Sequence, residues 1–248
     1  MESILPSLIL DGDKIVRIGG GFTTPTVYNG ERLFDRVYEL EEITLDSTVV
    51  QALSSFAGSY SVVGWISIFL AKYAEYLFYL SIPVYWFFGN RKNKRMIIQT
   101  IIVCCISMGI SWLLGQLIHR ERPFVTLPLT PLVPHDADAS FPSDHATAAL
   151  AIAATYWYYI KPKGRRFWMI LAVGVSLSRV FIGVHYPTDV LSGMVLGMSC
   201  AYAIHRLLPK FPRVVGLIDE GILLYEKMES AIIPPKKSAT RKRHHTIE

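Results

Sequence analysis

The 248-residue chain is poor in charged residues, which make up 18% of it, against about 25% in a typical soluble domain. Hydrophobic residues make up 51%, and the mean hydropathy is +0.33. The apolar residues form runs and do not alternate with polar ones. A soluble domain of this composition would lack solvent-facing groups, so we expect an integral membrane protein whose charges lie between and beyond its spans.

Cysteine is also scarce, and Cys104, Cys105 and Cys200 all lie inside apolar runs. An odd number of cysteines in such segments indicates side-chain packing and argues against a disulfide framework or a metal site. The first residues have no basic segment followed by a long apolar core. A cleavable signal peptide is therefore not expected, and insertion depends on the internal spans.

Long apolar runs dominate the middle of the chain, and a helix needs about 20 apolar residues to cross a bilayer. Residues 48–70 are either a span or a segment along the outer interface. The other predicted spans are 71–88, 96–118, 145–160, 167–184 and 187–208. The last begins at Pro187, a favourable first helical residue. We therefore expect an all-α, integral-membrane bundle of five to six transmembrane helices.

Three regions are expected: a polar extension over 1–47 that is partly helical or interfacial, a transmembrane domain over 48–210, and an amphipathic segment with a basic tail over 211–248. Residues 31–47 have apolar positions at roughly helical spacing, which favours a surface helix. No chemistry is predicted for this stretch. The extension is interpreted as a lid, a partner surface or a dispensable segment.

Basic clusters predict the orientation. RKNKR at 91–95, KPKGRR at 161–166 and the tail cluster at 236–245 fall on one side of the predicted spans, and the positive-inside rule makes this side cytoplasmic. The loops 119–144 and 184–187 then lie together on the outer side. The tail is interpreted as a topology anchor that attracts anionic lipid headgroups, in preference to a nucleic-acid-binding segment.

This topology brings three polar patches to the outer side: HRERPF (119–124), FPSDH (141–145) and SRVFIGVHYPTD (178–189). Arg179 lies in or near the apolar region, where a cation needs a partner such as an anion. Ser143 is predicted to be the N-cap of the following helix, and the start of a helix favours phosphate. The patches therefore predict an anion site.

The side chains of these patches predict phosphate-ester chemistry. Arg122 and Arg179 offer forked donors that suit phosphate oxygens. His185 and Asp189 are four residues apart across a helix start, so the carboxylate can accept from one ring nitrogen and leave the other as a nucleophile. His145, from a different helix, can protonate the departing oxygen. Each residue has a simpler explanation alone, and the prediction of hydrolysis through a phosphohistidine depends on their combination.

The three patches resemble the signature of the type 2 phosphatidic acid phosphatase and vanadium haloperoxidase superfamily, written RP, PSGH and SR-x5-H-x3-D. The matching residues are Arg122-Pro123, Pro142-Ser143-Asp144-His145, and Ser178-Arg179 with His185 and Asp189. With aspartate in place of the usual glycine, LVPHDADASFPSDHATAALAIA resembles in particular the bacitracin-resistance type of undecaprenyl-pyrophosphate phosphatase.

The resemblance implies that a long-chain polyprenyl diphosphate is hydrolysed to the monophosphate and inorganic phosphate, which recycles the cell-wall lipid carrier. The active site would face the extracytoplasmic side of the plasma membrane and would need no metal or cofactor. A homo-oligomer is left open, and nucleic acid is not expected as a partner. The implied roles are His185 as nucleophile, Asp189 as its orienter, His145 as acid, and Arg122, Ser143 and Arg179 as phosphate ligands with the backbone of Asp144 assisting.

The chain departs from the signature at one position, because the lysine expected seven residues before Arg122 is Gly115. Arg120 is the candidate replacement as a phosphate ligand, or else it marks the interface. His135, Asp136 and Asp138 either solvate their loop or recognise the second phosphate. Lys72 and Glu75 are further charges in an apolar region, and their expected role is snorkelling to the interface.

Two other functions are compatible with parts of the pattern. A phosphatase of other lipid phosphates, such as phosphatidate or phosphatidylglycerophosphate, would use the same groups. A transporter would also place polar residues in the membrane, but near mid-span and on both sides. Clustering at one face favours an enzyme, and the membrane-type composition disfavours a soluble haloperoxidase.

Overall fold

A computed structural model of the chain describes the backbone of residues 7–11, 14–18 and 31–232 and the side chains of residues 45–231. The first described elements, β1 (Ser7–Asp11) and β2 (Lys14–Ile18), pair as an antiparallel hairpin. The other described elements are helices. The basic tail cluster at 236–245 lies outside the described residues.

The helices are α1 (Glu31–Ser59), α2 (Ser61–Lys72), α3 (Glu75–Phe87), α4 (Arg91–Ile118), α5 (Pro123–Thr126), α6 (Asp144–Tyr159), α7 (Pro162–Phe181), α8 (Pro187–Leu207), η1 (Leu208–Lys210, a 3-10 turn) and α9 (Pro212–Ile232). Local sequence accounts for several starts. Pro162 and Pro187 occupy the first positions of α7 and α8, where the missing N–H is not needed. Asn90 caps α4, since its side-chain oxygen accepts from the N–H of Asn93 at 3.1 Å.

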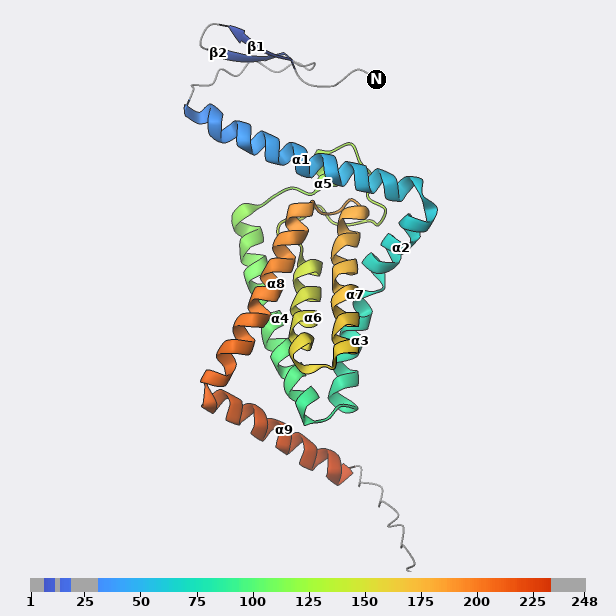
Figure 1. Cartoon of the computed structure of the whole chain (residues 1–248), viewed down its shortest axis with the longest axis vertical. Coiled ribbons are helices and arrows are strands. Elements are labelled where there is room, and N and C mark those ends of the chain that lie inside the picture. The colour runs from blue at the N-terminus through green and yellow to red at the C-terminus, as the bar shows by residue number, and fades with distance from the viewer. Residues whose placement is uncertain (1–6, 12–13, 19–30, 233–248) are drawn as a thin grey trace, which may run out of the picture.

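Helix α6 lies at the centre of the bundle, with α3, α4, α7 and α8 around it (Figure 1). Its small residues, such as Ala151 and Ala153, are buried and allow close packing. The closest approach is to α8 at Gly197, where an added Cβ would lie 2.4 Å from the carbonyl oxygen of Thr147. Glycine at this position therefore sets the spacing of the two helices that carry the second and third sequence patches.

The predicted span 71–88 is wrong at its start, because α2 already begins at Ser61 and a turn at 73–74 separates it from α3. The chain bends by 112° between Leu45–Ser59 and Ser61–Lys72. Helix α1 consequently lies across the end of the bundle, and α2 and α3 descend along one side of it (Figure 1). The predicted region boundary at 47/48 falls inside α1.

Two described helical segments, Arg91–Thr126 and Pro187–Lys210, are each long and apolar enough to cross a membrane, and the bent pair of Leu45–Ser59 and Ser61–Lys72 passes the same test together. Large apolar side chains on the outside of the bundle, such as Trp112, are exposed. Such a surface requires lipid around it. The all-α membrane bundle predicted from the sequence is confirmed.

The basic clusters at 91–95 and 161–166 lie at the starts of α4 and α7 and are mostly helical. Both starts are at the end of the bundle away from α1 (Figure 1). Arg95 donates two hydrogen bonds, of 2.6 and 2.7 Å, to the carboxylate of Asp219 in α9. The amphipathic helix α9 is thereby attached to the basic end of the bundle.

Candidate active site

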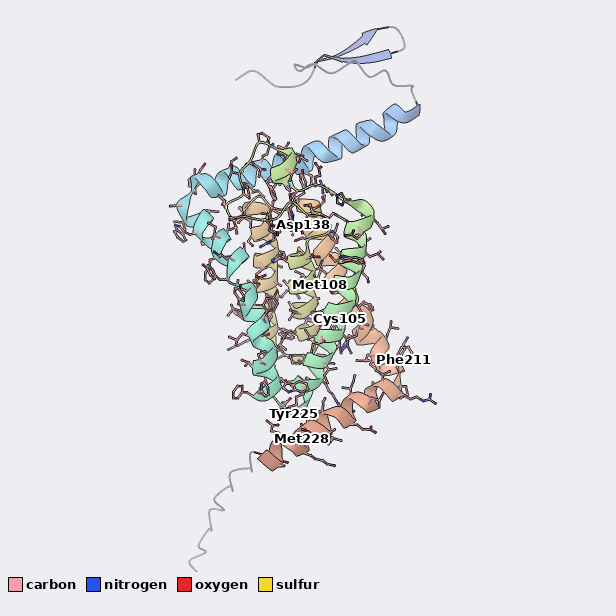
Figure 2. The ribbon with its side chains drawn as sticks, turned by 180° about the vertical axis from the view of Figure 1, so that it is seen from behind. Cys105, Met108, Asp138, Phe211, Tyr225 and Met228 are labelled. Carbon is pink, nitrogen blue, oxygen red and sulfur yellow. The ribbon has the colours of Figure 1, made fainter. Side chains whose placement is uncertain are left out.

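The predicted site residues lie at the end of the bundle that α1 covers, where the 119–143 segment meets the connection between α7 and α8. Figure 2 shows Asp138 at this end, and Tyr225 and Met228 of α9 at the other. The structure therefore brings the three sequence patches together, at the opposite end from the basic starts of α4 and α7.

His185 lies in the connection between α7 and α8 and is almost fully buried. The chain turns there because Gly183 adopts a φ of +78°, which would strain a residue with a side chain. The Nδ1 atom of His185 lies 2.8 Å from the carbonyl oxygen of Ser140, which can only accept, so we assign the ring proton to Nδ1. The Nε2 atom keeps its lone pair and lies 3.1 Å from Nη1 of Arg122.

The environment of His185 keeps its ring neutral. Burial, which disfavours the imidazolium, lowers its pKa to about 4. The Asp189 carboxylate opposes this shift, and the positive charge of Arg122 adds to it. Near pH 7 the imidazole is therefore uncharged, which is the form that can act as a nucleophile.

Asp189 is fully buried at the start of α8, but it does not accept a hydrogen bond directly from His185 as predicted. Its Oδ2 lies 3.9 Å from Nδ1 of His185, which is beyond hydrogen-bond distance. The same oxygen accepts from Oγ of Ser140 at 2.5 Å and from the N–H of Tyr186 at 3.0 Å. Ser140 thus binds the ring through its carbonyl group and the carboxylate through its hydroxyl group.

Arg122 is buried and bound on two sides. Its Nη1 donates to the carbonyl oxygen of Val184 at 2.9 Å, and its Nε donates to Oδ1 of Asp138 at 2.7 Å. Burial alone would raise the pKa of Asp138, but the hydrogen bond and charge of Arg122 outweigh it and hold that pKa below its usual value. Asp138 is therefore ionised and orients the guanidinium.

Ser143 occupies the N-cap position of α6, as predicted. Its hydroxyl makes no capping hydrogen bond, so the predicted capping interaction is wrong. Its Oγ is buried and has no hydrogen-bond partner within the described part of the chain. The Nε atom of Arg179 is also buried and has no hydrogen-bond partner among the described residues. Its Nη1 atom donates to the carbonyl oxygen of Ala71 at 2.9 Å. Buried polar atoms without partners are rare and costly. Two of them at this end of the bundle indicate a site for an anion with acceptor oxygens.

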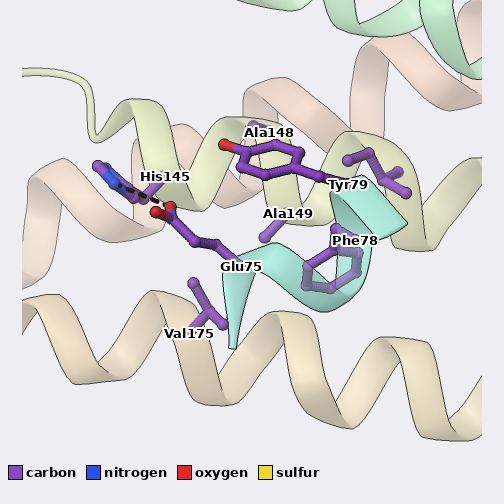
Figure 3. A pocket seen from close by; sticks show the side chains of 8 residues that line it. Glu75, Phe78, Tyr79, His145, Ala148, Ala149 and Val175 are labelled. Carbon is purple, nitrogen blue, oxygen red and sulfur yellow. Dashed lines mark ion pairs between the residues drawn. The ribbon is translucent and has the colours of Figure 1, made fainter. Parts of the chain in front are cut away.

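His145, in the first turn of α6, faces a carboxylate from α3. Its Nε2 lies 3.2 Å from Oε2 of Glu75. Figure 3 shows this pair at one end of a pocket that is otherwise lined mainly by apolar side chains of α3, α6 and α7, including Phe78 and Val175. The expected snorkelling role for Glu75 is wrong, because its carboxylate contacts the predicted general acid.

His135 lies near both of the other imidazoles. Its ring centroid is 6.4 Å from that of His145 and 6.3 Å from that of His185. Burial lowers the pKa of His135, and the charge of Arg122 lowers it further, so the ring is neutral near pH 7. This position is compatible with contact to a group bound between the two other rings.

The remaining predicted residues take other positions. The side chain of Asp136 is exposed. Asp144 accepts a hydrogen bond from Oγ of Ser111 at 2.7 Å and so connects α6 to α4. At Gly115, which replaces the lysine of the signature, an added Cβ would lie 3.3 Å from the carbonyl oxygen of Phe141. The loop before α6 fills the space beside this glycine.

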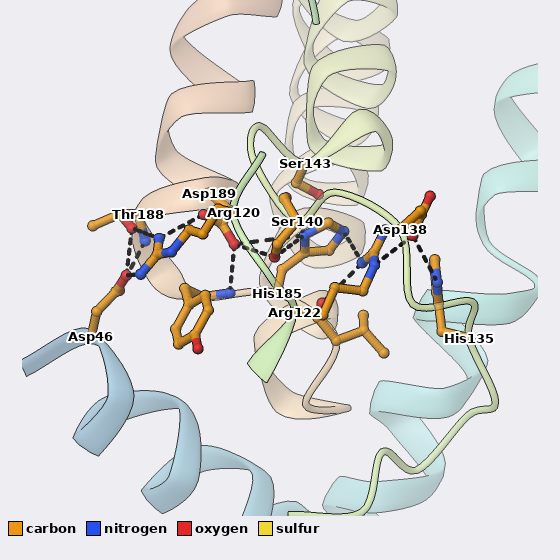
Figure 4. A network of polar contacts seen from close by, with 12 residues as sticks. Asp46, Arg120, Arg122, His135, Asp138, Ser140, Ser143, His185, Thr188 and Asp189 are labelled. Carbon is orange, nitrogen blue, oxygen red and sulfur yellow. Dashed lines mark hydrogen bonds and ion pairs between the residues drawn. The ribbon is translucent and has the colours of Figure 1, made fainter. Parts of the chain in front are cut away.

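Arg120 does not replace the missing lysine in this structure, because both of its terminal nitrogens are already engaged. Nη1 donates to Oδ1 of Asp189 and to Oγ1 of Thr188, both at 2.7 Å, and Nη2 donates to Oδ2 of Asp46 at 2.6 Å. Its guanidinium also lies over the ring of Tyr186, 3.8 Å from the centroid. Arg120 therefore binds the carboxylate of Asp189 on the side away from His185 (Figure 4).

Sequence reasoning missed three site residues: Asp46, Glu75 and Ser140. None of them belongs to the three patches, and each reaches the site through contacts between distant segments. The available signal was weak: Glu75 is an acid inside an apolar stretch, which needs a partner. Within residues 45–231, no group of three or more His, Cys, Asp or Glu side chains is placed to hold a metal ion.

Comparisons with known proteins match the part of the chain that contains the three sequence patches. Residues 96–213 match the family model described as the PAP2 superfamily. The "Bacitracin transport permease protein BcrC" of Bacillus licheniformis is 33% identical over 202 residues, which cover 81% of this chain and 96% of that protein. The "Undecaprenyl-diphosphatase BcrC" of Bacillus subtilis (strain 168) is 32% identical, over 71% of this chain and 92% of that protein.

A solved structure supports the fold. The crystal structure of Aquifex aeolicus LpxE aligns with a TM-score of 0.51 at 23% identity, and the alignment covers 66% of this chain and 94% of that one.

Proposed function

We propose that this chain, which belongs to the PAP2 superfamily, hydrolyses the diphosphate of a long-chain polyprenyl lipid such as undecaprenyl diphosphate. The products would be the lipid monophosphate and inorganic phosphate. The printed name of the Bacillus subtilis relative supports this substrate, and the geometry of the site supports the reaction.

One observation carries the proposal: a neutral, buried imidazole whose free nitrogen faces a guanidinium. The Nδ1 atom of His185 is held by Ser140, and Nε2 lies 3.1 Å from Arg122. A phosphoryl group placed there would meet a nucleophile and a cation at once. The unpartnered Oγ of Ser143 and Nε of Arg179 add donors for its oxygens.

In the first step, Nε2 of His185 forms a bond to the terminal phosphorus, and the bond from that phosphorus to the bridging oxygen breaks. The lipid monophosphate leaves with the electron pair of that bond, and His145 donates a proton to the departing oxygen. His185 becomes cationic on phosphorylation, and the nearby Asp189 carboxylate stabilises it. Glu75, whose Oε2 lies 3.2 Å from Nε2 of His145, is placed to form an ion pair with this ring when it carries the proton used in this step.

In the second step, water attacks the phosphorus of the phosphohistidine. His145, now neutral, accepts a proton from that water, and the phosphorus–nitrogen bond breaks. Inorganic phosphate leaves and His185 regains its lone pair. The cycle returns both histidines to their initial protonation states.

The second phosphate of a diphosphate would lie near His135, whose ring is within 6.4 Å of both other imidazoles. The apolar pocket beside His145, lined by Phe78 and Val175 among others, offers a surface for the first part of the lipid chain. The position of His135 favours a lipid diphosphate over phosphatidate or phosphatidylglycerophosphate, which remain the alternative substrates.

The proposed site faces the extracytoplasmic side of the cell membrane. The support is the position of the basic starts of α4 and α7, at the opposite end of the bundle from the site (Figure 1), together with the positive-inside rule. Transport is the alternative suggested by the printed name of the Bacillus licheniformis relative. The clustering of Arg122, His145 and His185 at one end favours catalysis.

The experiment is to purify the chain in detergent and measure phosphate release from undecaprenyl diphosphate, phosphatidate and phosphatidylglycerophosphate. We expect the highest kcat/KM on the diphosphate and complete loss of release in the His185→Ala variant. The matched control is Glu121→Gln, an exposed position in the same segment as Arg122. Equal rates on all three lipids would contradict the substrate, and full activity of His185→Ala would contradict the mechanism.

A further inference from the structure

We propose that Asp46 of helix α1 is a positioning residue for this reaction, and that this helix is thus part of the catalytic apparatus. This inference rests on the proposed function. Asp46 does not reach His185. It binds Arg120, and Arg120 binds Asp189, so the carboxylate of α1 acts through two intermediate groups (Figure 4).

Helix α1 is fixed to the site end of the bundle by one face. Asp46, Val50, Ser54 and Ala57 are buried at intervals of three or four residues, which places them on the same side of the helix. Val50 packs in an apolar cluster that contains residues of α6, α7 and α8 and also Tyr186. The position of Asp46, one turn before Val50, is therefore set by burial and does not depend on its charge alone.

Asp46 is only 6% exposed and accepts hydrogen bonds on both oxygens. Oδ2 accepts from Nη2 of Arg120 at 2.6 Å and from Oγ1 of Thr188 at 2.5 Å. Oδ1 accepts from the N–H of Thr188 at 3.1 Å. This N–H belongs to the first turn of α8, where a carboxylate is favoured by the unpaired amides and the helix dipole. Asp46 thus connects α1 to the element that carries Asp189.

The guanidinium of Arg120 is shared between two carboxylates. Its Nη1 binds Oδ1 of Asp189 and its Nη2 binds Oδ2 of Asp46. This division leaves Oδ2 of Asp189 to accept from Ser140, which also holds the ring of His185. The chain of contacts from α1 to the nucleophile is continuous.

Without the charge of Asp46, Asp189 would be the one carboxylate left to bind the two terminal nitrogens of Arg120. A guanidinium prefers a bidentate contact with a single carboxylate, so it would move toward both oxygens of Asp189 and compete with Ser140. The orientation of His185 would then be lost while the phosphate ligands Arg122 and Arg179 stayed in place. The defect would therefore be in kcat more than in KM.

The test is a double-mutant cycle with Asp46→Asn, Arg120→Gln and the pair, measuring kcat and KM for phosphate release together with Tm. We expect Asp46→Asn to lower kcat about tenfold or more, as for a lost hydrogen bond to a charged group, with KM within about twofold. The pair should be no slower than the slower single variant, because both changes act on one contact chain. Glu121→Gln is the charge-matched control, and its kcat, KM and Tm should equal those of the wild type.

Each result decides the inference. An unchanged kcat in Asp46→Asn would overturn it, and so would a loss in the pair equal to the product of the two single losses. A fall in Tm with kcat preserved at temperatures where the variant is folded would assign Asp46 to stability alone. The cycle is run on whichever lipid phosphate the wild-type chain hydrolyses, so inactivity of the wild type on the diphosphate counts only against the proposed substrate.

A structure of the Asp46→Asn variant gives a readout that does not depend on turnover. We expect both ends of the Arg120 guanidinium to lie on Asp189, with Oγ of Ser140 displaced from Oδ2. An Arg120 that keeps its wild-type contact with Oδ1 alone, and an undisturbed contact between Ser140 and Asp189, would overturn the inference.

Discussion

The Nε2 atom of His185 lies 3.1 Å from Nη1 of Arg122. A neutral nitrogen with a free lone pair and a permanent cation therefore face each other in a buried space. In the absence of an anion the guanidinium donates to the ring nitrogen. A phosphoryl group between them would accept from Arg122 and free the lone pair for attack. In the proposed reaction, binding of the substrate would therefore be coupled to activation of His185.

Replacing Ser140 with alanine tests the link between His185 and Asp189. The backbone carbonyl that holds the ring would remain, but Oδ2 of Asp189 would lose its 2.5 Å hydrogen bond. We expect kcat to fall about tenfold or more, since a hydrogen bond to a charged group is worth about 1.5–3 kcal/mol. The control is Ser55→Ala, at an exposed position of α1. Equal kcat values for the two variants would show that the hydroxyl does not support the carboxylate.

Glu75→Gln tests the carboxylate that faces His145 at 3.2 Å. Loss of its negative charge should weaken the general acid, and a general acid matters most for a poor leaving group. We expect kcat to fall about tenfold or more on a lipid monophosphate ester and much less on p-nitrophenyl phosphate, whose leaving group needs little protonation. Glu121→Gln serves as the control. Equal losses on both substrates would argue for a structural role of Glu75.

The pH profile of kcat/KM should reflect the environment of His185. Because burial lowers the pKa of this ring to about 4, the neutral nucleophile persists well below the usual histidine value of 6.5. We therefore expect the acid limb of the kcat/KM profile for phosphate release, which we assign to protonation of His185, to lie near pH 4. A single acid limb at pH 6.5 would contradict the neutral, buried ring.

The same shift makes a prediction for stability. Between about pH 6.5 and 4 the unfolded chain binds a proton at His185 and the folded chain does not, so the free energy of unfolding decreases as pH falls through this window. The slope of Tm against pH should therefore be smaller in His185→Asn than in the wild type. Parallel curves for the two proteins would show that His185 titrates normally in the folded state.

Gly197→Ala tests the packing of α8 on α6. A Cβ at this position would lie 2.4 Å from the carbonyl oxygen of Thr147 and 2.8 Å from the amide nitrogen of Ala151, and these backbone atoms cannot rotate away. We expect destabilisation of about 1–3 kcal/mol or more, as for other overpacked cores, seen as a lower Tm. The control is Gly109→Ala in α4, where a Cβ meets nothing within 4 Å. An equal or higher Tm for Gly197→Ala would contradict the close approach.

The membrane bundle and the position of the site could be predicted from local sequence. Apolar runs of span length have few alternatives to a helix in lipid, and Pro162 and Pro187 mark helix starts wherever the helices lie. Because Arg122, His145 and His185 each follow or precede such a run, the alternation of spans was enough to place them at one end of the bundle.

The partners of these residues could not be predicted from local sequence. The carbonyl of Ser140 binds His185 from 45 residues away, and Asp46 binds the amide of Thr188 from 142 residues away. Ser143 is a residue type that is preferred at the N-cap of a helix, and it occupies that position before α6. Its hydroxyl still makes no capping hydrogen bond. Such contacts depend on the relative positions of packed helices, which a one-dimensional pattern does not contain.

Residue order alone therefore determined the class of protein, most of its membrane helices, and which chemical groups reach one membrane face, because hydropathy and helix signals act over short stretches of chain. Packing in three dimensions determined which carboxylate faces each histidine, where the cation of Arg120 is bound, and that α1 joins the site. Hydrogen bonds and ion pairs have a range of a few ångströms, so small shifts between helices decide them.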